Sequence, residues 1–162
     1  MAIKLRNMAT LYIRQNGKFL LLYRVGSRVV PPSWCGIGGH FEENELNEPI
    51  AAMLREAEEE IDLKPDDFTN IALRYVTFRL KNGEIRQNYY YFADLRANVP
   101  LTMECNEGKL DWFAQSALPY DAMPHTAQYV MQHYMETGVG NDILYAGTTV
   151  ENGVQFHAMV EF

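Results

Sequence analysis

Apolar residues dominate two neighbouring stretches near the start of the chain, residues 3–13 and 18–24. The first is rich in apolar and β-branched residues, and the second, KFLLLYR, is a nearly continuous apolar run typical of a strand buried on both faces. Between them lies Asn16-Gly17, a dipeptide that supplies the positive φ angles of a tight hairpin turn. The pattern predicts a β-hairpin here, followed by a loop over residues 25–33 that carries Arg28.

The Asn-Gly dipeptide recurs at residues 82–83 and 152–153, each time between strand-like stretches. The second copy would join strands over residues 68–80 and 85–95. After the third copy apolar and other residues alternate, with Val154, Phe156, Ala158 and Val160 set against Gln155, His157, Met159 and Glu161. Such alternation predicts a half-buried strand, so three hairpins with the same turn indicate a mainly antiparallel sheet.

Two other stretches have helical periodicity. Pro49 suits a first helical turn, where its missing N–H costs nothing. The apolar residues after it fall on one arc of a helical wheel about 100° wide; they are Ile50, Met53, Leu54, Ala57 and Ile61. A second helix is predicted over residues 124–135, and short strands over residues 34–37 and 110–113. We expect a single α+β domain over residues 1–162, with two helices set against sheets.

Composition narrows the class of protein. An apolar fraction of 48% and a charged fraction of 22% are those of a globular domain, and no apolar run reaches the roughly 18 residues of a membrane span. The first ten residues lack the features of a signal peptide, so cytoplasmic residence is expected. Cys35 and Cys105 form no C-x-x-C pair, which fits a reducing compartment. A net charge of −7 argues against capture of duplex nucleic acid, but phosphate ligands stay open because bound metals reverse the local field.

The predicted first helix ends in a cluster of acids, REAEEEID. Glu56, Glu59 and Glu60 stand at i, i+3 and i+4, so their side chains share one stripe. A solvated acidic face is the ordinary explanation of such a cluster. However, like charges at this spacing repel, and the end of a helix disfavours anions. Because hard cations prefer carboxylate oxygens, a site for Mg²⁺ or Mn²⁺ explains the stripe better. Gly38-Gly39, one loop earlier, would let the backbone approach a ligand closely.

Residues 39–63 resemble the Nudix box, Gly-x5-Glu-x7-Arg-Glu-U-x-Glu-Glu-x-Gly-U, where U is a bulky aliphatic residue. Gly39, Glu45 and Arg55 take the first three fixed positions, and the glutamates follow in register. Three departures stand out. Nine residues rather than seven separate Glu45 from Arg55, Ala57 is small for a U position, and Asp62 replaces a glycine. Since aspartate accepts left-handed geometry better than most residues, and no carboxylate is lost, the box is retained.

The flanking segments resemble the MutT-like, 8-oxo-dGTP diphosphatase-like branch of the Nudix hydrolases. The resemblance implies a Nudix fold, with mixed and antiparallel sheets sandwiched between helices, and hydrolysis of a pyrophosphate bond with Mg²⁺ or Mn²⁺. The metal ligands it implies are Gly38, Glu56, Glu59, Glu60 and Glu107. Glu56, Glu59 and Glu107 are the candidates for catalytic base, and Glu45 and Arg55 are expected to pair and hold the loop.

Substrate choice is the least determined property. Arg24 and Gly39 are candidates for contact with phosphate, and Tyr120, Asp121 and His125 for contact with a base. The leading expectation is a small nucleotide such as 8-oxo-dGTP. The alternatives are another pyrophosphate, such as a nucleoside diphosphate sugar, and a nucleotide sensor without turnover. A monomer and a homodimer are both open, since the aromatic residues 89–92 suit a core or an interface.

Overall fold

The computed structural model describes residues 2–25 and 31–160. Its strands are β1 (Lys4–Gln15), β2 (Lys18–Arg24), β3 (Ser33–Cys35), β4 (Ile37–His40), β5 (Phe68–Lys81), β6 (Glu84–Leu95), β7 (Glu104–Cys105), β8 (Gly108–Ala114), β9 (Leu144–Val150) and β10 (Gly153–Met159). The α-helices are α1 (Pro49–Ile61) and α2 (His125–Glu136), and 3-10 turns occupy Glu43–Glu45, Pro65–Asp67, Gln115–Ala117, Tyr120–Ala122 and Gly138–Gly140. The predicted positions of Arg28 and Glu161 lie outside the described residues. No helix in the described part of the chain could cross a membrane.

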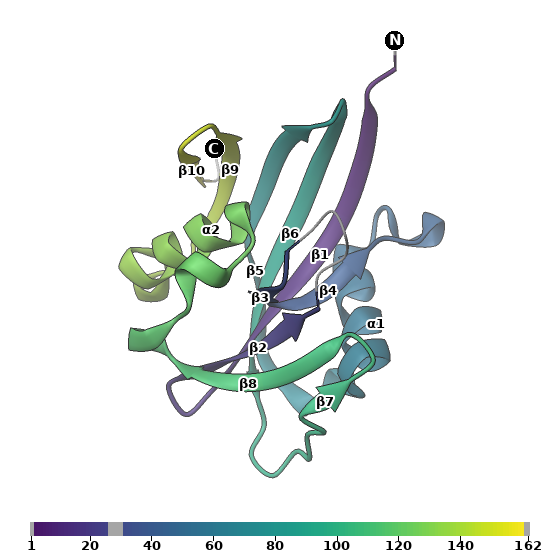
Figure 1. Ribbon diagram of the computed structural model, residues 1–162, viewed down its shortest axis with the longest axis vertical. Helices are drawn as coiled ribbons and strands as arrows, with labels where there is room; N and C mark the ends of the chain where they lie inside the picture. The colour runs from purple at the N-terminus through teal and green to yellow at the C-terminus, as the bar shows by residue number, and fades with distance from the viewer. Residues whose placement is uncertain (1, 26–30, 161–162) are drawn as a thin grey trace.

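The strands form one mixed sheet in the order β10-β9-β5-β6-β1-β2-β8-β7, with β3 beside β2 and β4 beside β1. Pairing is parallel between β1 and β6 and between β5 and β9, and antiparallel elsewhere. The two helices lie on opposite sides of the long strands β5, β6 and β1 (Figure 1). The predicted α+β sandwich is confirmed.

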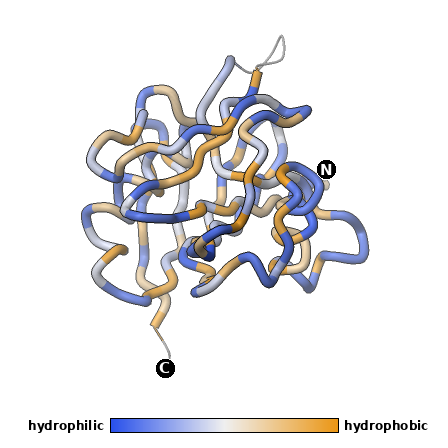
Figure 2. Tube along the Cα trace, turned by 90° about the horizontal axis from the view of Figure 1, so that it is seen from below, coloured by the Kyte–Doolittle hydropathy of each residue, from blue (hydrophilic) through white to orange (hydrophobic). Residues whose placement is uncertain are grey.

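Alternate residues of β1 enter two separate cores. Leu11 and Ile13 face the core under α1, whereas Tyr12 faces the core under α2. Hydrophobic residues recur along the inner strands, and the outer loops are largely hydrophilic (Figure 2). Because both faces of the sheet are covered, strand β2 is buried on both sides, as its continuous apolar run predicts.

Three local predictions are corrected. Ile50 is 41% exposed and Ala52 is buried in its place, so the buried face of α1 is turned slightly from the predicted arc. The predicted strand over residues 34–37 is divided at Gly36 between β3 and β4. In the third hairpin Val150 pairs with Gly153, so residues 151–152 form the turn. Gly153 instead begins β10 and is buried beside the Tyr129 ring, which explains the one-residue shift.

Candidate active site

The glutamates of α1 face strand β4, which carries the two glycines. Helix α1 begins at Pro49 and ends at Ile61, and the capping residue Asp62 has a φ of 54° and a ψ of 35°, in the left-handed region. Its backbone N–H bonds the carbonyls of Ala57 and Glu58, which closes the last turn. The aspartate therefore takes the role that glycine has in the box.

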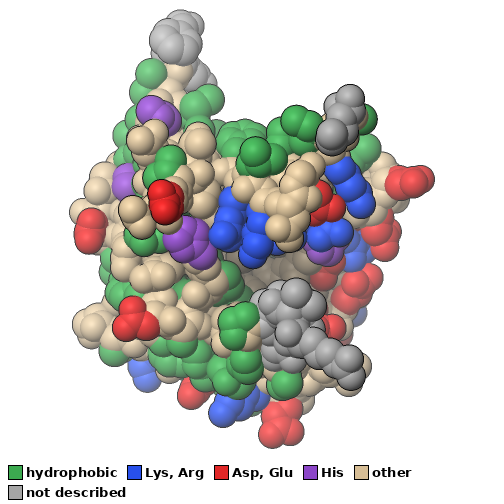
Figure 3. Space-filling view, turned by 45° about the horizontal axis from the view of Figure 1, so that its top comes forward, with side chains coloured by type: hydrophobic (Ala, Val, Ile, Leu, Met, Phe, Trp, Pro, Cys, Tyr) green, Lys and Arg blue, Asp and Glu red, His purple; other side chains and the backbone are tan. Residues whose placement is uncertain are grey.

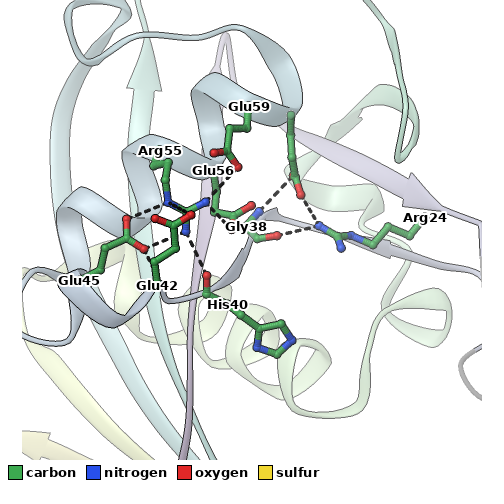
Figure 4. A network of polar contacts seen from close by, with 9 residues as sticks. Arg24, Gly38, His40, Glu42, Glu45, Arg55, Glu56 and Glu59 are labelled. Carbon is green, nitrogen blue, oxygen red and sulfur yellow. Dashed lines mark hydrogen bonds and ion pairs between the residues drawn. The ribbon is translucent and has the colours of Figure 1, made fainter.

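Arg55 holds the loop before α1 against the helix (Figure 4). Its guanidinium donates to both carboxylate oxygens of the buried Glu45, at 2.8 and 2.9 Å, and to the His40 carbonyl at 3.0 Å. These hydrogen bonds lower the pKa of Glu45 and raise that of Arg55. The same guanidinium reaches Glu56 at 3.1 Å and Glu59 at 2.9 Å. Arg55 thus connects the loop carboxylate to two glutamates of the stripe.

Arg24, at the end of β2, approaches the other side of the stripe (Figure 4). Its Nη2 donates to the Gly38 carbonyl at 2.7 Å and to Glu60 at 2.6 Å. The Gly38 N–H lies 3.3 Å from the second oxygen of Glu60. The Arg24 guanidinium therefore bridges the Gly38 carbonyl and the Glu60 carboxylate, two groups that are predicted to bind a metal.

The two glycines are required by close approach. A Cβ on Gly39 would lie 2.5 Å from an oxygen of Glu56, and a Cβ on Gly38 would lie 1.9 Å from the Ala9 carbonyl. Gly38 also has a φ of 158°. The absence of side chains at these positions lets the Glu56 carboxylate rest against β4.

Two carboxylates of the stripe have raised pKa values. Burial is the main cause at Glu60, where it outweighs Arg24 and, with Glu56 and Glu107 nearby, raises the pKa to about 7. Burial also raises the pKa of Glu56, against the effect of Arg55. In both groups burial, which disfavours the charged form of a carboxyl, outweighs the effect of the neighbouring arginine on the pKa. Such a site gains from a further cation.

An acidic cavity of about 310 Å³ opens over the stripe, lined by Glu56, Glu59, Glu60, Cys105, Asn106 and Glu107. Glu107 comes from the turn between β7 and β8, and its carboxylate lies 3.9 Å from Arg24. Residues far apart in the sequence thus bring four carboxylates to one cavity. The structure groups them as the sequence predicts; their roles as ligands and base stay predictions.

The donor chemistry of the acidic cavity fits Mg²⁺ or Mn²⁺. Carboxylate and carbonyl oxygens are the ligands that such hard cations take, and the cavity with the adjoining Gly38 carbonyl supplies both kinds. As the side chains stand, no three carboxylate, imidazole or thiol groups within residues 2–25 and 31–160 converge closely enough to hold an ion. Glu59 and Glu60 are turned to Arg55 and Arg24, and they would have to release these partners to bind a metal.

A groove of about 330 Å³ adjoins Arg24 and the glycines on the other face of β4 and β1, a volume in the range of ligand pockets. Its lining comes from β1, β4, β6 and the first turn of α2 and includes Met8, Thr10, Gly39, Asn88, Tyr90 and Ala127. A smaller pocket of about 150 Å³ shares Met8, Asn88, Tyr90 and Ala127 with the groove and continues it. The acidic cavity forms the polar end of the site, and the groove forms a largely apolar channel beside it.

Only one of the three residues predicted to contact a base lines a pocket beside the site. His125 lines the smaller pocket. Tyr120 and Asp121 do not line the groove or that pocket. Tyr120 packs against the core under α2, and burial raises its pKa, whereas Asp121 is exposed. The 3-10 turn Tyr120–Ala122 directs these side chains elsewhere, a local geometry that residue types alone do not reveal.

Larger hollows of about 490 and 570 Å³ lie around Arg14 and Asp94, and none of the box glutamates lines them. Arg14 and Asp94 already pair at 2.8 Å, and Arg14 also donates to the Tyr134 hydroxyl at 2.6 Å. These groups support the sheet and helix α2 rather than a ligand. We therefore place the site at the acidic cavity and its groove.

The NUDIX domain family matches residues 4–134. Because the match spans most of the chain, the protein belongs to the Nudix family, whose enzymes hydrolyse pyrophosphate bonds. A search of curated proteins gave no match.

Solved structures show the same fold. A NUDIX hydrolase from Nitrosomonas europaea superposes with a TM-score of 0.70 at 16% identity, covering 92% of this chain and 81% of its own. A MutT NUDIX hydrolase from Burkholderia pseudomallei gives 0.65 at 24% identity, with 80% and 97% covered. An Ap4A hydrolase from C. elegans gives 0.65 at 18% identity, with 86% and 100% covered. Structural neighbours thus include both a MutT hydrolase and an Ap4A hydrolase.

Proposed function

We propose that this protein hydrolyses the pyrophosphate bond of a nucleotide, using Mg²⁺ or Mn²⁺ held by Glu56, Glu59, Glu60, the Gly38 carbonyl and Glu107. The observation that carries the proposal is the acidic cavity, where four carboxylates from α1 and the β7–β8 turn meet. Next to it a groove offers space for the rest of a nucleotide. Cys35 and Cys105 are unpaired thiols, which is compatible with the reducing cytoplasm that we propose as its location.

The glutamates and arginines of the site would have different roles in hydrolysis. A divalent cation, when bound, neutralises phosphate oxygens and acidifies a water. Glu56 or Glu59 would accept the water's proton, a role supported by the position of both residues in the lining of the cavity. Arg24, released from Glu60, would hold a phosphate oxygen of the substrate. Arg55 keeps Glu56 oriented while remaining fixed to Glu45.

For the substrate, a modified purine nucleotide such as 8-oxo-dGTP is the first compound that we would test. A different pyrophosphate, such as a nucleoside diphosphate sugar, is the second candidate. It gains support because Tyr120 and Asp121, two of the three residues predicted to contact a base, line neither the groove nor the smaller pocket. A sensor without turnover has little support, because all the box glutamates are present.

A pyrophosphatase panel separates these functions. Purified protein with Mg²⁺ is given 8-oxo-dGTP, the ordinary nucleoside triphosphates, dinucleoside polyphosphates and nucleoside diphosphate sugars, and product release is followed by chromatography. Turnover of 8-oxo-dGTP above dGTP supports the first substrate, and turnover of another compound supports the second. Binding without turnover of any member would contradict hydrolysis and indicate the sensor.

A further inference from the structure

The groove ends in a row of three arginines that the sheet register places side by side. Arg6 of β1 pairs with Arg86 of β6, and Arg86 pairs with Arg79 of β5. Residues directly opposite one another in a sheet point to the same face. The arginine row therefore crosses three strands on the face that lines the groove. Arg79 and Arg86 themselves line the 150 Å³ pocket.

The positive charge of the arginine row is poorly compensated. Glu84 is shared among Lys4, Arg6 and Arg86, each at 3.8 Å, and Arg79 forms no ion pair with a described carboxylate. The buried Nε of Arg86 has no hydrogen-bond partner among the described residues. Like charges set opposite one another on neighbouring strands destabilise a sheet. An anion bound between them would remove that cost.

The row is continuous with the catalytic end of the site. Thr10 of β1 pairs with Gly38, and Arg6 lies four residues before Thr10 on the same strand. At about 3.3 Å per residue, the backbone at Arg6 is about 13 Å from the backbone at Thr10. The groove and the smaller pocket share lining residues over this distance. A ligand with its pyrophosphate at Gly38 therefore extends toward the arginines.

The opposite wall of the smaller pocket is the start of α2, where Pro124, His125, Thr126 and Ala127 line it. Within the described part of the chain, no side chain caps this helix. The free N–H groups of a first turn favour negative charge, so this wall adds to the field of the arginines. Figure 3 shows Lys and Arg side chains gathered in a hollow near the middle of this face, beside a histidine. No described Asp or Glu lines the groove or the pocket.

We infer that the substrate carries a second phosphate group, bound by Arg79 and Arg86 at the far end of the groove from the hydrolysed pyrophosphate. The pocket volume of about 150 Å³ is below that of a pocket for a whole ligand, so it suits one appended group on a nucleoside already in the groove. The inference rests on the proposed pyrophosphate hydrolysis. It goes beyond it by naming the substrate class, a nucleoside pyrophosphate with an additional phosphomonoester.

Equilibrium binding tests this without catalysis. Calorimetric titrations with Mg²⁺ compare adenosine and guanosine 5′-monophosphates with their 2′,5′- and 3′,5′-bisphosphates, none of which contains a pyrophosphate bond. We expect at least one bisphosphate to bind about tenfold or more tighter than its monophosphate, the usual gain from hydrogen bonds to a charged group. The double variant Arg79→Gln/Arg86→Gln should lose this preference, with affinity for the monophosphate changed less than twofold.

Lys81→Gln is the matched control, because it removes one exposed positive charge from the same strand outside the pocket. It should keep the preference. Melting at low salt checks the fold, and the double variant should melt no lower than the parent since like-charge repulsion is relieved. If it fails to fold, Arg79→Gln alone is used, with a reduced preference expected.

Three results would overturn the inference. The first is equal affinity for every bisphosphate and its monophosphate, and the second is a preference for a bisphosphate that survives in the arginine variants. The third comes from adding 8-oxo-guanosine 5′-monophosphate to the titrations: if it binds more tightly than guanosine 5′-monophosphate and the arginine variants abolish this preference, the arginines read a base. Because these titrations require no hydrolysis, an inactive panel would contradict the proposed function and leave the binding result standing.

Discussion

Gly39 is the residue on which the position of the Glu56 carboxylate most directly depends. A Cβ atom added to Gly39 would lie only 2.5 Å from an oxygen of the Glu56 carboxylate. The clash is with the end of a flexible side chain rather than with backbone. A substitution here therefore separates function from folding, because Glu56 can swing away at little cost to stability.

Gly39→Ala should reduce turnover by about 10- to 100-fold, since a displacement of about 1 Å of a catalytic group has effects of this order. The free energy of unfolding should change by less than about 1 kcal/mol, the scale of ordinary surface substitutions. Steady-state kinetics and urea denaturation measure the two quantities. Gly140→Ala is the control, because a Cβ there meets open space and turnover should be unchanged. Unchanged turnover in Gly39→Ala would show that the Glu56 position is not critical.

Residue spacing predicted the acidic half of the site well and the groove poorly. The box fixes Arg55 and the glutamates on one helix, so their grouping follows from helical periodicity. Tyr120 and Asp121 could not be placed, because the direction of a side chain in an isolated 3-10 turn depends on tertiary packing. Arg79 and Arg86 were missed although the sequence contains their pairing. The two-residue turn Asn82-Gly83 sets Lys81 opposite Glu84, and this register sets Arg79 opposite Arg86.

At the scale of elements, turns and caps determine how the strands and α1 meet at the site. Asn16 and Asn82 have φ angles of 52° and 54° and are followed by glycines at 74° and 73°, as tight hairpin turns require. Asp62 supplies the left-handed residue that ends α1. The third Asn-Gly pair is the exception, because burial of Gly153 beside α2 decides the register there. Turn chemistry is thus predictable where the turn is exposed, and less so where a helix packs on it.

Asp62→Gly should raise the free energy of unfolding by about 0.5–1 kcal/mol, because glycine adopts the left-handed conformation without the strain of a side chain. Asp62→Ala should lower it by about 1 kcal/mol for the same reason. Chemical denaturation measures the free energy of unfolding of both variants. Because the Asp62 side chain is exposed, neither substitution removes buried packing contacts. Equal stabilities for the two variants would contradict the assigned cap.

On the scale of the whole molecule, the sheet carries a core on each face, and the one under α2 contains a titrating group. The Nδ1 atom of His133 in α2 shares a hydrogen bond of 2.7 Å with the Tyr75 hydroxyl, and the His133 ring lies edge-on to Tyr145 and tilted against Phe156. Burial lowers its pKa below the usual value. The unfolded chain therefore binds this proton more readily than the folded one.

This predicts that the His133 contribution to stability is fully present above a pH of about 6.5, the pKa of an unperturbed histidine, and is lost as pH falls through the lower folded value. Unfolding free energies of the parent and of His133→Gln, measured between pH 5 and 8, should differ in slope, the parent losing more stability on acidification. His157→Gln, at an exposed histidine of β10, should keep the parent's slope. Identical slopes for the parent and His133→Gln would contradict the assignment.

Metal-dependent hydrolysis by the α1 glutamates is the central proposal, and the Glu59→Gln variant tests it directly. Glu59 and Glu58 are both exposed neighbours on α1, but only Glu59 lines the acidic cavity. With Mg²⁺ and a substrate found by the panel, Glu59→Gln should fold normally and lose about 100-fold or more of the parent's turnover, as expected for a lost base or metal ligand. Glu58→Gln should retain it. Full turnover in a folded Glu59→Gln, or an equal loss in both variants, would contradict the central claim.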